Sequence, residues 1–368
     1  MRATKATVRL GAIGHNLKAA MQLVHQSRVL PVIKANAYGH GAIEIARKLE
    51  TFRSTDVPAF AVAIMEEAVQ LRQAGIVRPL LVLQGSQQVS DVAEAAASNI
   101  WLMVHNTDQI DHIKRASVKL PLRVWLKVDT GMHRLGLDVE QLDAAIEALD
   151  NSGKVQPSMV LCSHLASADD LENSQTERQI EQLKSLAEQN KLHWSIANSA
   201  GIMGWPQSHA DWVRPGYMLY GNSPVPFDIR TEGPVDEIRL QPAMTLTSEI
   251  ISIRQVAAGE TVGYGGSWVA EKPATIGVVA IGYADGYPRH AVSGTPVWLN
   301  GQRLPLAGRV SMDMIAVDLS DASGVLIGDE VELWGQNLSV NEVAAHAGTI
   351  GYEILAGLTG RVPIQYLP

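Results

Sequence analysis

The sequence predicts an α/β protein in which a (β/α)8 barrel of the TIM type precedes a second, mostly β domain. Two observations lead to this expectation. From residue 28 to residue 221, short apolar segments alternate with stretches of helical period, which is the pattern of repeated βα units around a parallel sheet. After about residue 230, valine, threonine and glycine dominate and helical periodicity nearly vanishes, which is typical of strands separated by glycine turns.

The predicted barrel strands are short apolar runs. In chain order they are RVLPVIK (28–34), PAFAVAI (58–64), PLLVLQ (79–84), IWLMVH (100–105), LRVWLKV (122–128), SMVLCSH (158–164), HWSIAN (193–198) and DWVRPGYMLYG (211–221). Between them, segments such as AIEIARKLE, QVSDVAEAAAS, QLDAAIEALD and QTERQIEQLKSLAEQN place apolar residues three or four positions apart, as amphipathic helices do. Eight such units close into a barrel of about 200 residues. We therefore expect residues 10–230 to form the barrel.

The remainder of the chain predicts the β domain. Its strand candidates lie in AMTLTSEIISIRQVAAGETVGYGG, ATIGVVAIGYADGYP, TPVWLNGQRLP and GDEVELWG, each interrupted or bounded by glycine. We assign residues 231–368, together with residues 1–9, to this domain. The proline- and glycine-containing segment 225–237 is the expected boundary.

Composition restricts the class of protein and ligand. A hydrophobic fraction of 46% and a charged fraction of 18% are typical of a soluble globular chain. The net charge of -8, without a basic cluster, predicts neither nucleic-acid nor membrane-surface binding, so we expect a small-molecule ligand. The single cysteine, Cys162, cannot form an internal disulfide, and no segment approaches the ~20 apolar residues of a membrane span. We therefore expect a cytoplasmic protein.

Polar residues gather at the ends of the predicted strands, where active sites of this barrel are found. They are Lys34 on the first strand, Lys127 and Asp129 on the fifth, His164 on the sixth, Asn198 and Ser199 on the seventh, and Arg214 in the eighth segment. Taken singly, each also fits a structural role, such as a solvated lysine or a helix cap. Their common rim predicts one site.

The loops after the seventh and eighth strands are where such barrels often bind phosphate. A hydroxyl at Ser199 and free backbone amides near Gly216 and Tyr217 could cradle a phosphate group. A lysine at Lys34 on the same rim could hold a phosphorylated aldehyde as a Schiff base, and pyridoxal phosphate is the obvious candidate. We expect no metal.

Nine motifs, in order along nearly the whole chain, resemble the alanine racemase family, whose members combine a TIM-like barrel and a β domain with pyridoxal 5'-phosphate. They are VIKANAYGHG, LKVDTGMHRLG, SHLASADD, ANSAG, VRPGYMLYG, VGYGGSW, IGYADGYPR, GRVSMDM and GYEILAGLTGRVP.

The resemblance assigns roles to individual residues. Lys34 matches the lysine that carries the cofactor, and Arg214 matches the arginine at its pyridine nitrogen, with His164 as neighbour. Arg134 matches the arginine near the substrate carboxylate, and Lys127 matches a lysine that is carbamylated in several family members. The positions matching phosphate-binding residues are Tyr38, Ser199, Gly216, Tyr217 and Tyr352, with Asn198 beside them.

Two β-domain residues imply a homodimer. Tyr264 and Met312 match residues that reach the active site of the other subunit, so the resemblance implies shared sites. Tyr283 could line the channel that admits substrate, but packing in a β core is nearly as good an interpretation. Ser311 stands where some relatives carry cysteine.

Racemisation needs a proton donor or acceptor on each face of the substrate carbon. Lys34 would serve one face of the cofactor-bound substrate and Tyr264 the other, in a two-base mechanism. Because an unperturbed tyrosine has a pKa near ~10, Tyr264 needs either a lowered pKa or the role of acid. Arg214 can only donate protons in hydrogen bonds, so the pyridine nitrogen would stay unprotonated.

The resemblance implies an alanine racemase that supplies D-alanine for peptidoglycan. A broader amino-acid racemase on the same scaffold and a non-catalytic pyridoxal phosphate-binding protein remain open as alternatives. A carrier would need no second domain bearing Tyr264 and Met312, which weighs against it. Relatives that decarboxylate basic amino acids share the barrel but resemble these motifs poorly.

Overall fold

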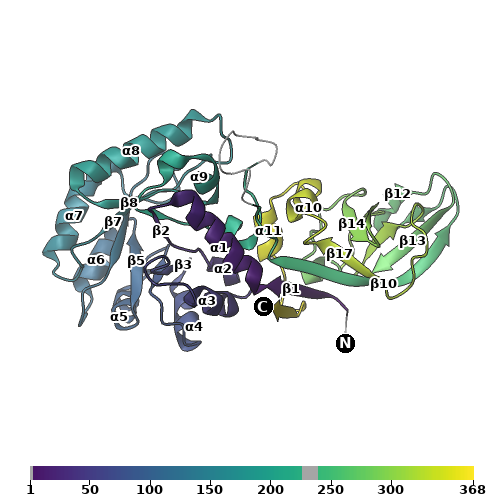
Figure 1. Cartoon of the computed structure of the whole chain (residues 1–368), viewed down its shortest axis with the longest axis horizontal. Helices are drawn as coiled ribbons and strands as arrows, with labels where there is room; N and C mark the ends of the chain where they lie inside the picture. Colours follow the sequence, from purple (N-terminus) through teal and green to yellow (C-terminus); the bar gives the residue numbers. More distant parts are fainter. Residues whose placement is uncertain (1–2, 226–238) are drawn as a thin grey trace. The chain divides into compact units, whose positions relative to one another are not determined.

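The structure is a computed structural model that describes residues 3–225 and 239–368 (Figure 1). It divides into two compact units. The barrel unit comprises Gly14–Ala37 and Ala42–Leu240, and the β unit comprises Met1–Ile13, Tyr38–Gly41 and Gln241–Pro368. Apart from Val225, the boundary segment predicted at 225–237 lies outside the described residues.

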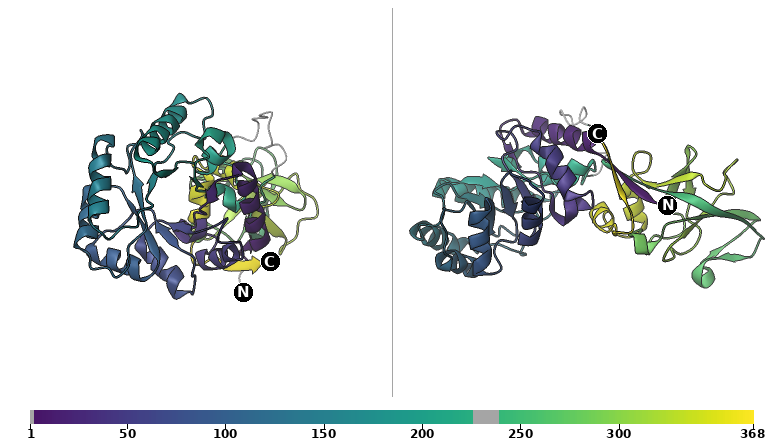
Figure 2. Two further views of the ribbon diagram at one scale, coloured as in Figure 1. Left: turned by 60° about the vertical axis from the view of Figure 1, so that its left-hand side comes forward. Right: turned by 90° about the horizontal axis from the view of Figure 1, so that it is seen from below.

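The barrel unit is built on eight parallel strands within the described residues, with helices around them (Figure 2). The sheet order is β2-β9-β8-β7-β6-β5-β4-β3, and a parallel bridge between Val32 and Ala61 closes the ring. The strands are β2 (Arg28–Val29), β3 (Phe60–Val62), β4 (Leu80–Val82), β5 (Ile100–Val104), β6 (Val124–Lys127), β7 (Val160–Cys162), β8 (His193–Ser195) and β9 (Trp212–Val213).

The helices that accompany the barrel strands carry an apolar face toward them. They are α1 (Leu10–Val24), α3 (Ala42–Glu50), α4 (Met65–Gln73), α5 (Val89–Ala97), α6 (Thr107–Arg115), α7 (Leu142–Asn151), α8 (Ser174–Asn190) and α9 (Ser199–Gly204), with 3-10 turns η1 (Val139–Gln141), η2 (Pro206–Ser208) and η3 (Tyr217–Tyr220). In α8, for example, Ile180, Leu183 and Ala187 are buried at spacings of three and four residues. No helix in the described part of the chain is long and apolar enough to cross a membrane.

The predicted (β/α)8 barrel is confirmed, with every predicted strand in its expected order. All eight strands are shorter than predicted, and the first and the eighth differ most. The first ends at Val29, because Pro31 lacks an N–H for a sheet ladder and only Val32 beyond it forms a bridge. The eighth ends at Val213, and the following YMLY run forms η3 instead of a strand.

Tryptophans fill the N-terminal half of the barrel. The rings of Trp101 and Trp125 meet Trp212 edge-on, with centroids 6.1 and 5.3 Å away. The guanidinium of Arg123 lies 4.5 Å from the Trp101 ring and Arg28 lies 5.3 Å from Trp212. This packing leaves the C-terminal ends of the strands for polar groups.

The β unit is a mostly antiparallel sheet system to which the N-terminal segment contributes a strand, β1, that pairs in parallel with β18. The order is β15-β14-β17-β10-β1-β18, and β13 joins β10 to β16. The elements are β1 (Lys5–Arg9), β10 (Met244–Val256), β11 (Thr261–Val262), β12 (Trp268–Val269), β13 (Ala274–Val279), β14 (Pro296–Leu299), β15 (Gln302–Pro305), β16 (Ile315–Asp318), β17 (Glu330–Trp334), β18 (Ile364–Leu367), α10 (Val340–His346), α11 (Gly351–Ala356), η5 (Tyr264–Gly266) and η6 (Tyr283–Asp285). The sequence predicts almost no helix here, and this expectation misses the two short helices α10 and α11.

Candidate functional site

Lys34 begins α2 (Lys34–Tyr38), a turn whose backbone is left-handed. The φ angles of Ala35, Asn36, Ala37 and Tyr38 lie between 51° and 55°. For L-residues this conformation costs roughly 1–2 kcal/mol per residue, and glycine is the usual exception. A run of four non-glycine residues therefore needs contacts that impose it, and such strain is found mainly at functional sites.

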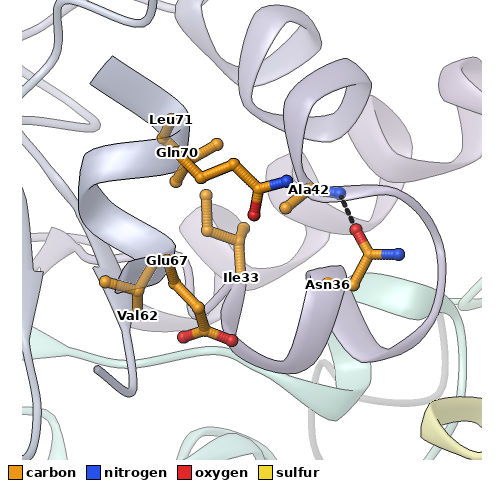
Figure 3. A pocket seen from close by; sticks show the side chains of 7 residues that line it. All are labelled: Ile33, Asn36, Ala42, Val62, Glu67, Gln70 and Leu71. Atoms are coloured by element: carbon orange, nitrogen blue, oxygen red, sulfur yellow. Dashed lines mark hydrogen bonds between the residues drawn. The ribbon is translucent and has the colours of Figure 1, made fainter. Parts of the chain in front are cut away.

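Two side chains hold this turn. Glu67 Oε1 accepts a hydrogen bond from the N–H of Ala35 at 2.6 Å, and its Oε2 accepts one from Ala63 at 2.7 Å. Asn36 Oδ1 accepts the N–H of Ala42 at 2.9 Å, at the first residue of α3 (Figure 3). The turn is thus tied to the end of β3 on one side and to the start of α3 on the other.

A cavity of about 380 Å³ lies beside the turn. Figure 3 shows α4 on one side of it and Asn36 and Ala42 on the other. Its lining residues are Ile33, Asn36, Ala42, Val62, Glu67, Gln70 and Leu71. The aliphatic members give it an apolar surface, to which Asn36, Glu67 and Gln70 add polar groups.

The rim of the barrel is cationic. Burial lowers the pKa of Lys34, the charges of Arg134 and Arg214 lower it further, and Glu67 partly opposes them. Burial likewise lowers the pKa of Lys127, with Arg214 and Arg134 acting in the same direction. Both amines are therefore more easily neutral than a solvated lysine. A cluster of this charge is suited to a ligand with anionic groups.

Arg214 is buried, with 5% of its surface exposed, and forms no ion pair with any residue the structure describes. Its Nη1 donates to Ser195 Oγ at 2.6 Å, and its Nη2 donates to the carbonyls of Ser163 at 2.6 Å and Ile196 at 3.2 Å. A buried cation with hydrogen-bond partners but no counter-ion is costly unless a ligand supplies an acceptor. The hydrogen bonds to Ser195, Ser163 and Ile196 hold the Arg214 guanidinium in one orientation.

His164 lies next to Arg214, with Nδ1 3.2 Å from Arg214 Nη2. Because a guanidinium can only donate, Nδ1 is the acceptor and a neutral imidazole carries its proton on Nε2. Burial lowers the pKa of His164 well below its usual value, and the charges of Arg214, Lys127, Arg134 and Lys34 add to this effect. His164 is therefore neutral at pH 7.

Ser199 lies where two backbone amides converge. Its Oγ accepts the N–H of Gly216 at 3.1 Å and that of Met218 at 3.2 Å, so the Gly216 amide expected to be free is bonded within the chain. Asn198 caps α9 by accepting the N–H of Gly201 at 2.9 Å. The amides are aimed at a single oxygen, which is the donor arrangement that an oxyanion requires.

Asp129 shapes the loop that carries Arg134. Its Oδ1 accepts hydrogen bonds from the amides of Gly131, Met132 and His133 at 2.8, 3.0 and 3.1 Å. Burial raises the pKa of Asp129, but these bonds outweigh it and the pKa is lowered. Asp129 therefore acts as a loop anchor, and Arg134 at the exposed end of the loop contributes charge to Lys34 and Lys127.

In the β unit, Tyr38 and Tyr352 lie together, with ring centroids 6.0 Å apart. Burial raises the pKa of Tyr38, and Tyr352 adds to the rise, so its phenol stays protonated. Tyr352 is on α11, against whose Leu355 the Gly39 backbone packs closely. A protonated phenol can donate a hydrogen bond to an anionic group.

The motifs carrying Tyr264, Tyr283 and Met312 meet in the β unit. The N–H of Tyr283 donates to the Ser311 carbonyl at 3.0 Å. Gly265 lies close to the Arg309 guanidinium, because a Cβ added to this glycine would be 3.3 Å from it. Tyr264 is 71% exposed, Met312 52% and Tyr283 38%. The core interpretation of Tyr283 therefore does not hold, because a packed β-core tyrosine would be buried.

The predicted residues thus form one group in each unit. Lys34, Lys127, Arg134, His164 and Arg214 are electrostatically coupled, and Asn198, Ser199, Gly216 and Tyr217 form the adjoining turns. The sequence reasoning missed Glu67, whose only signal is an acidic residue in the first turn of a helix after a strand. Among the described residues, no cluster of histidine, cysteine or carboxylate side chains could hold a metal ion.

Comparisons with known proteins agree with this geometry. Residues 8–224 match the family described as alanine racemase, N-terminal domain, and residues 243–366 match alanine racemase, C-terminal domain. The chain is 45% identical over 366 residues to an alanine racemase of Vibrio cholerae, covering 100% of this chain and 99% of the relative. It is 46% identical over 367 residues to a catabolic alanine racemase of Pseudomonas putida, with coverage of 100% and 99%.

Solved structures show the same similarity. The biosynthetic alanine racemase from Pseudomonas aeruginosa superposes with a TM-score of 0.92 at 45% identity, covering 100% of both chains. The alanine racemase from Bartonella henselae, solved with covalently bound pyridoxal phosphate, superposes with a TM-score of 0.87 at 30% identity, again over 100% of both chains.

Proposed function

The chain belongs to the alanine racemase family, and from this premise we propose that it interconverts L-alanine and D-alanine with pyridoxal 5'-phosphate bound at Lys34. The observation that carries the proposal is the state of Lys34. Its amine, with a lowered pKa, lies in a rim whose other charges are mostly cationic. A partly neutral lysine is the form that bonds covalently to an aldehyde.

The residues present fit the cofactor. We assign the phosphate to the turns of Ser199, Gly216 and Tyr217. The amides of Gly216 and Met218 donate to Ser199 Oγ, and a phosphate oxygen would accept them in its place. Tyr38 and Tyr352 would add phenolic donors. The buried guanidinium of Arg214 would donate a hydrogen bond to the pyridine nitrogen. When bound, pyridoxal phosphate stabilises negative charge on the α carbon of the substrate.

We assign the two proton-transfer roles to Lys34 and Tyr264. Burial and the neighbouring arginines favour the neutral amine of Lys34, so this residue can accept a proton from one face of the substrate carbon. The phenol of Tyr264 would donate from the opposite face, and the roles exchange when the reaction runs in reverse. Arg134 would bind the substrate carboxylate, with Lys127 orienting it, carbamylated or not.

Arg214 and His164 keep the ring nitrogen unprotonated in this scheme. Arginine holds its protons under all ordinary conditions, and His164 is neutral with Nδ1 accepting from Arg214. Arg214 would donate a hydrogen bond to the pyridine nitrogen, but neither side chain would transfer a proton to it. We infer that this limits electron withdrawal by the cofactor and favours proton exchange over transamination.

We further propose that the protein is a cytoplasmic homodimer in which the partner subunit contributes Tyr264 and Met312. The exposure of both side chains supports this. Tyr264 is 71% exposed and Met312 is 52% exposed, so a second subunit can contact both of them. Tyr283, on the segment bonded to Ser311, would limit the side chains admitted. Supply of D-alanine for peptidoglycan is the role that we propose, as the family resemblance implies.

Chiral analysis of purified holoenzyme tests the function. L-alanine, L-serine and L-lysine are incubated in parallel, with Lys34→Ala as the control. Rapid formation of D-alanine that Lys34→Ala abolishes, with little turnover of the other two, is the expected result. Equal turnover of all three would indicate the broader racemase, and no turnover despite cofactor bound at Lys34 would indicate a carrier.

A further inference from the structure

Glu67 connects the cofactor lysine's turn to the barrel. It lies in the first turn of α4, directly after β3, and each of its two carboxylate oxygens accepts one backbone N–H. One of these belongs to Ala35 and the other to Ala63. The peptide that joins Lys34 to Ala35 is therefore held against the end of β3 by a single side chain.

We propose that Glu67 is a positioning residue for Lys34, because its carboxylate fixes the peptide that follows Lys34 and thereby the direction in which the lysine side chain leaves the backbone. This inference rests on the proposed role of Lys34 as the cofactor lysine. It assigns Glu67 no contact with substrate or cofactor.

The left-handed turn makes this fixation necessary. Asparagine tolerates left-handed angles, but alanine does not favour the φ values of 52° and 55° found at Ala35 and Ala37, so without an external acceptor the segment gains by relaxing toward ordinary angles. Relaxation at Ala35 would rotate the peptide after Lys34 and move its Nζ. A displacement of about 1 Å at a reacting group can lower a rate by about 100-fold.

The charge of Glu67 acts in addition to its hydrogen bonds. Lys34 is coupled to the cations Arg134 and Arg214 and to the neutral imidazole of His164, and Glu67 is the acidic group that opposes them. A negative charge favours the protonated form of a nearby nitrogen. Replacing Glu67 with an amide would therefore lower the pH at which a proton leaves the Lys34 nitrogen.

A helix-capping role is the alternative interpretation. The bond from Ala63 to Glu67 satisfies an amide just before the N-terminus of α4, and capping alone contributes to stability. Glu66 provides a matched control, because it is the preceding residue of the same helix turn, carries the same charge, is exposed and forms no side-chain bond with the described residues.

The test compares the holoenzymes of Glu67→Gln, Glu67→Asp and Glu66→Gln. Visible circular dichroism per bound cofactor reports how rigidly the cofactor at Lys34 is oriented, and its absorbance as a function of pH reports the protonation of the nitrogen at Lys34. Peptide mapping after borohydride reduction identifies the modified lysine. The melting temperature and kcat and KM for alanine complete the set.

We expect Glu67→Gln to lower the dichroism, to reduce kcat by about tenfold or more with a smaller change in KM, and to move the absorbance titration to lower pH. Glu67→Asp keeps the charge and should return the titration toward that of the unmodified enzyme, while Glu66→Gln should change none of these. A Glu67→Gln enzyme that loses only melting temperature would show capping alone and overturn the inference. Cofactor mapped to another lysine would instead overturn the proposed function.

Discussion

Nη2 of Arg214 lies 3.2 Å from Nδ1 of His164, and this pair sets the tautomer of a histidine in the middle of a cationic rim. Because the arginine can only donate, the imidazole accepts at Nδ1 and remains neutral. Protonating His164 would place two cations in contact in a partly buried position. The pair therefore makes the stability of the barrel sensitive to acid.

The direction of this pH dependence follows from the lowered pKa of His164. The unfolded imidazole titrates near ~6.5, whereas burial and the neighbouring cations hold the folded pKa well below that value. Between the two pKa values the unfolded state binds more protons, so the free energy of unfolding falls as the pH falls below ~6.5. The slope contributed by one such group is at most about 1.4 kcal/mol per pH unit.

We therefore expect His164→Gln to flatten the pH dependence of stability below ~6.5. Urea unfolding of cofactor-saturated protein at several pH values and one protein concentration measures it. His290→Gln, at an exposed position, is the control. Equal slopes in His164→Gln and the unmodified protein would contradict a neutral His164 with a lowered pKa.

The two-base assignment predicts an asymmetric variant. Tyr264→Phe removes the phenol that serves one face of the substrate and leaves Lys34 intact on the other. We expect exchange of the α proton with solvent to fall more for one enantiomer of alanine than for the other. Proton NMR in deuterated water follows both, and equal losses in the two directions would refute separate roles.

A mixed dimer tests whether the site is shared. If Tyr264 reaches the partner's active site, a heterodimer of Lys34→Ala and Tyr264→Phe chains contains one complete site and one doubly defective site. Up to about half of the activity should then return in the heterodimer fraction, since one of two sites is intact. Differently tagged chains allow that fraction to be isolated. No recovery in verified heterodimers would contradict a shared site.

The barrel was predictable because its strands are buried on both faces. Segments such as IWLMV in β5 and LLV in β4 are continuous apolar runs, which are typical of strands in a parallel sheet covered on both faces. In such a barrel the C-terminal ends of these runs lie on one rim. Lys127, His164 and Arg214 could be placed on one rim by that logic alone.

The details that failed depend on contacts distant in sequence. Ala35 adopts a left-handed angle because Glu67, 32 residues later, accepts its N–H, and no local signal in KANAY predicts this. The YMLY run resembles a strand, but Pro215 interrupts the backbone donors and Ser199 captures the amide of Met218. The six-residue helix α11 is too short to show a period.

Arg361 links two of the turns that carry proposed active-site residues. Its Nε lies 3.2 Å from Oδ1 of the fully buried Asp285, and its Nη2 donates to Asp313 at 2.7 Å. Arg361→Gln removes the charge that compensates Asp285, so we expect a loss of about 1–3 kcal/mol in the free energy of unfolding and an increased KM for alanine. Urea unfolding and steady-state kinetics measure the two effects.

Arg303→Gln is the matched control for this change. Its ion pair with Glu342 has both side chains accessible, at 55% and 32% exposure, so its loss should cost less than about 1 kcal/mol. A similar cost for the two variants would show that the Asp285 ion pair behaves as a surface pair.

Replacing Gly39 with alanine is expected to cause a severe and local defect, because two constraints act on this residue. Its φ is +78°, and a Cβ at this position would lie 2.0 Å from the Leu355 carbonyl oxygen of α11. Gly75 has a similar φ of +87° with no atom within 4 Å of an added Cβ, so Gly75→Ala isolates the conformational cost of about 1 kcal/mol.

We expect Gly39→Ala to lose at least about 3 kcal/mol in the free energy of unfolding, because the backbone must move to relieve the overlap. That movement would displace Tyr38 from Tyr352, so the dissociation constant for pyridoxal phosphate should rise as well. Urea unfolding and cofactor titration of the two alanine variants measure these effects, and equal destabilisation would show that φ alone, not the contact with Leu355, requires glycine here.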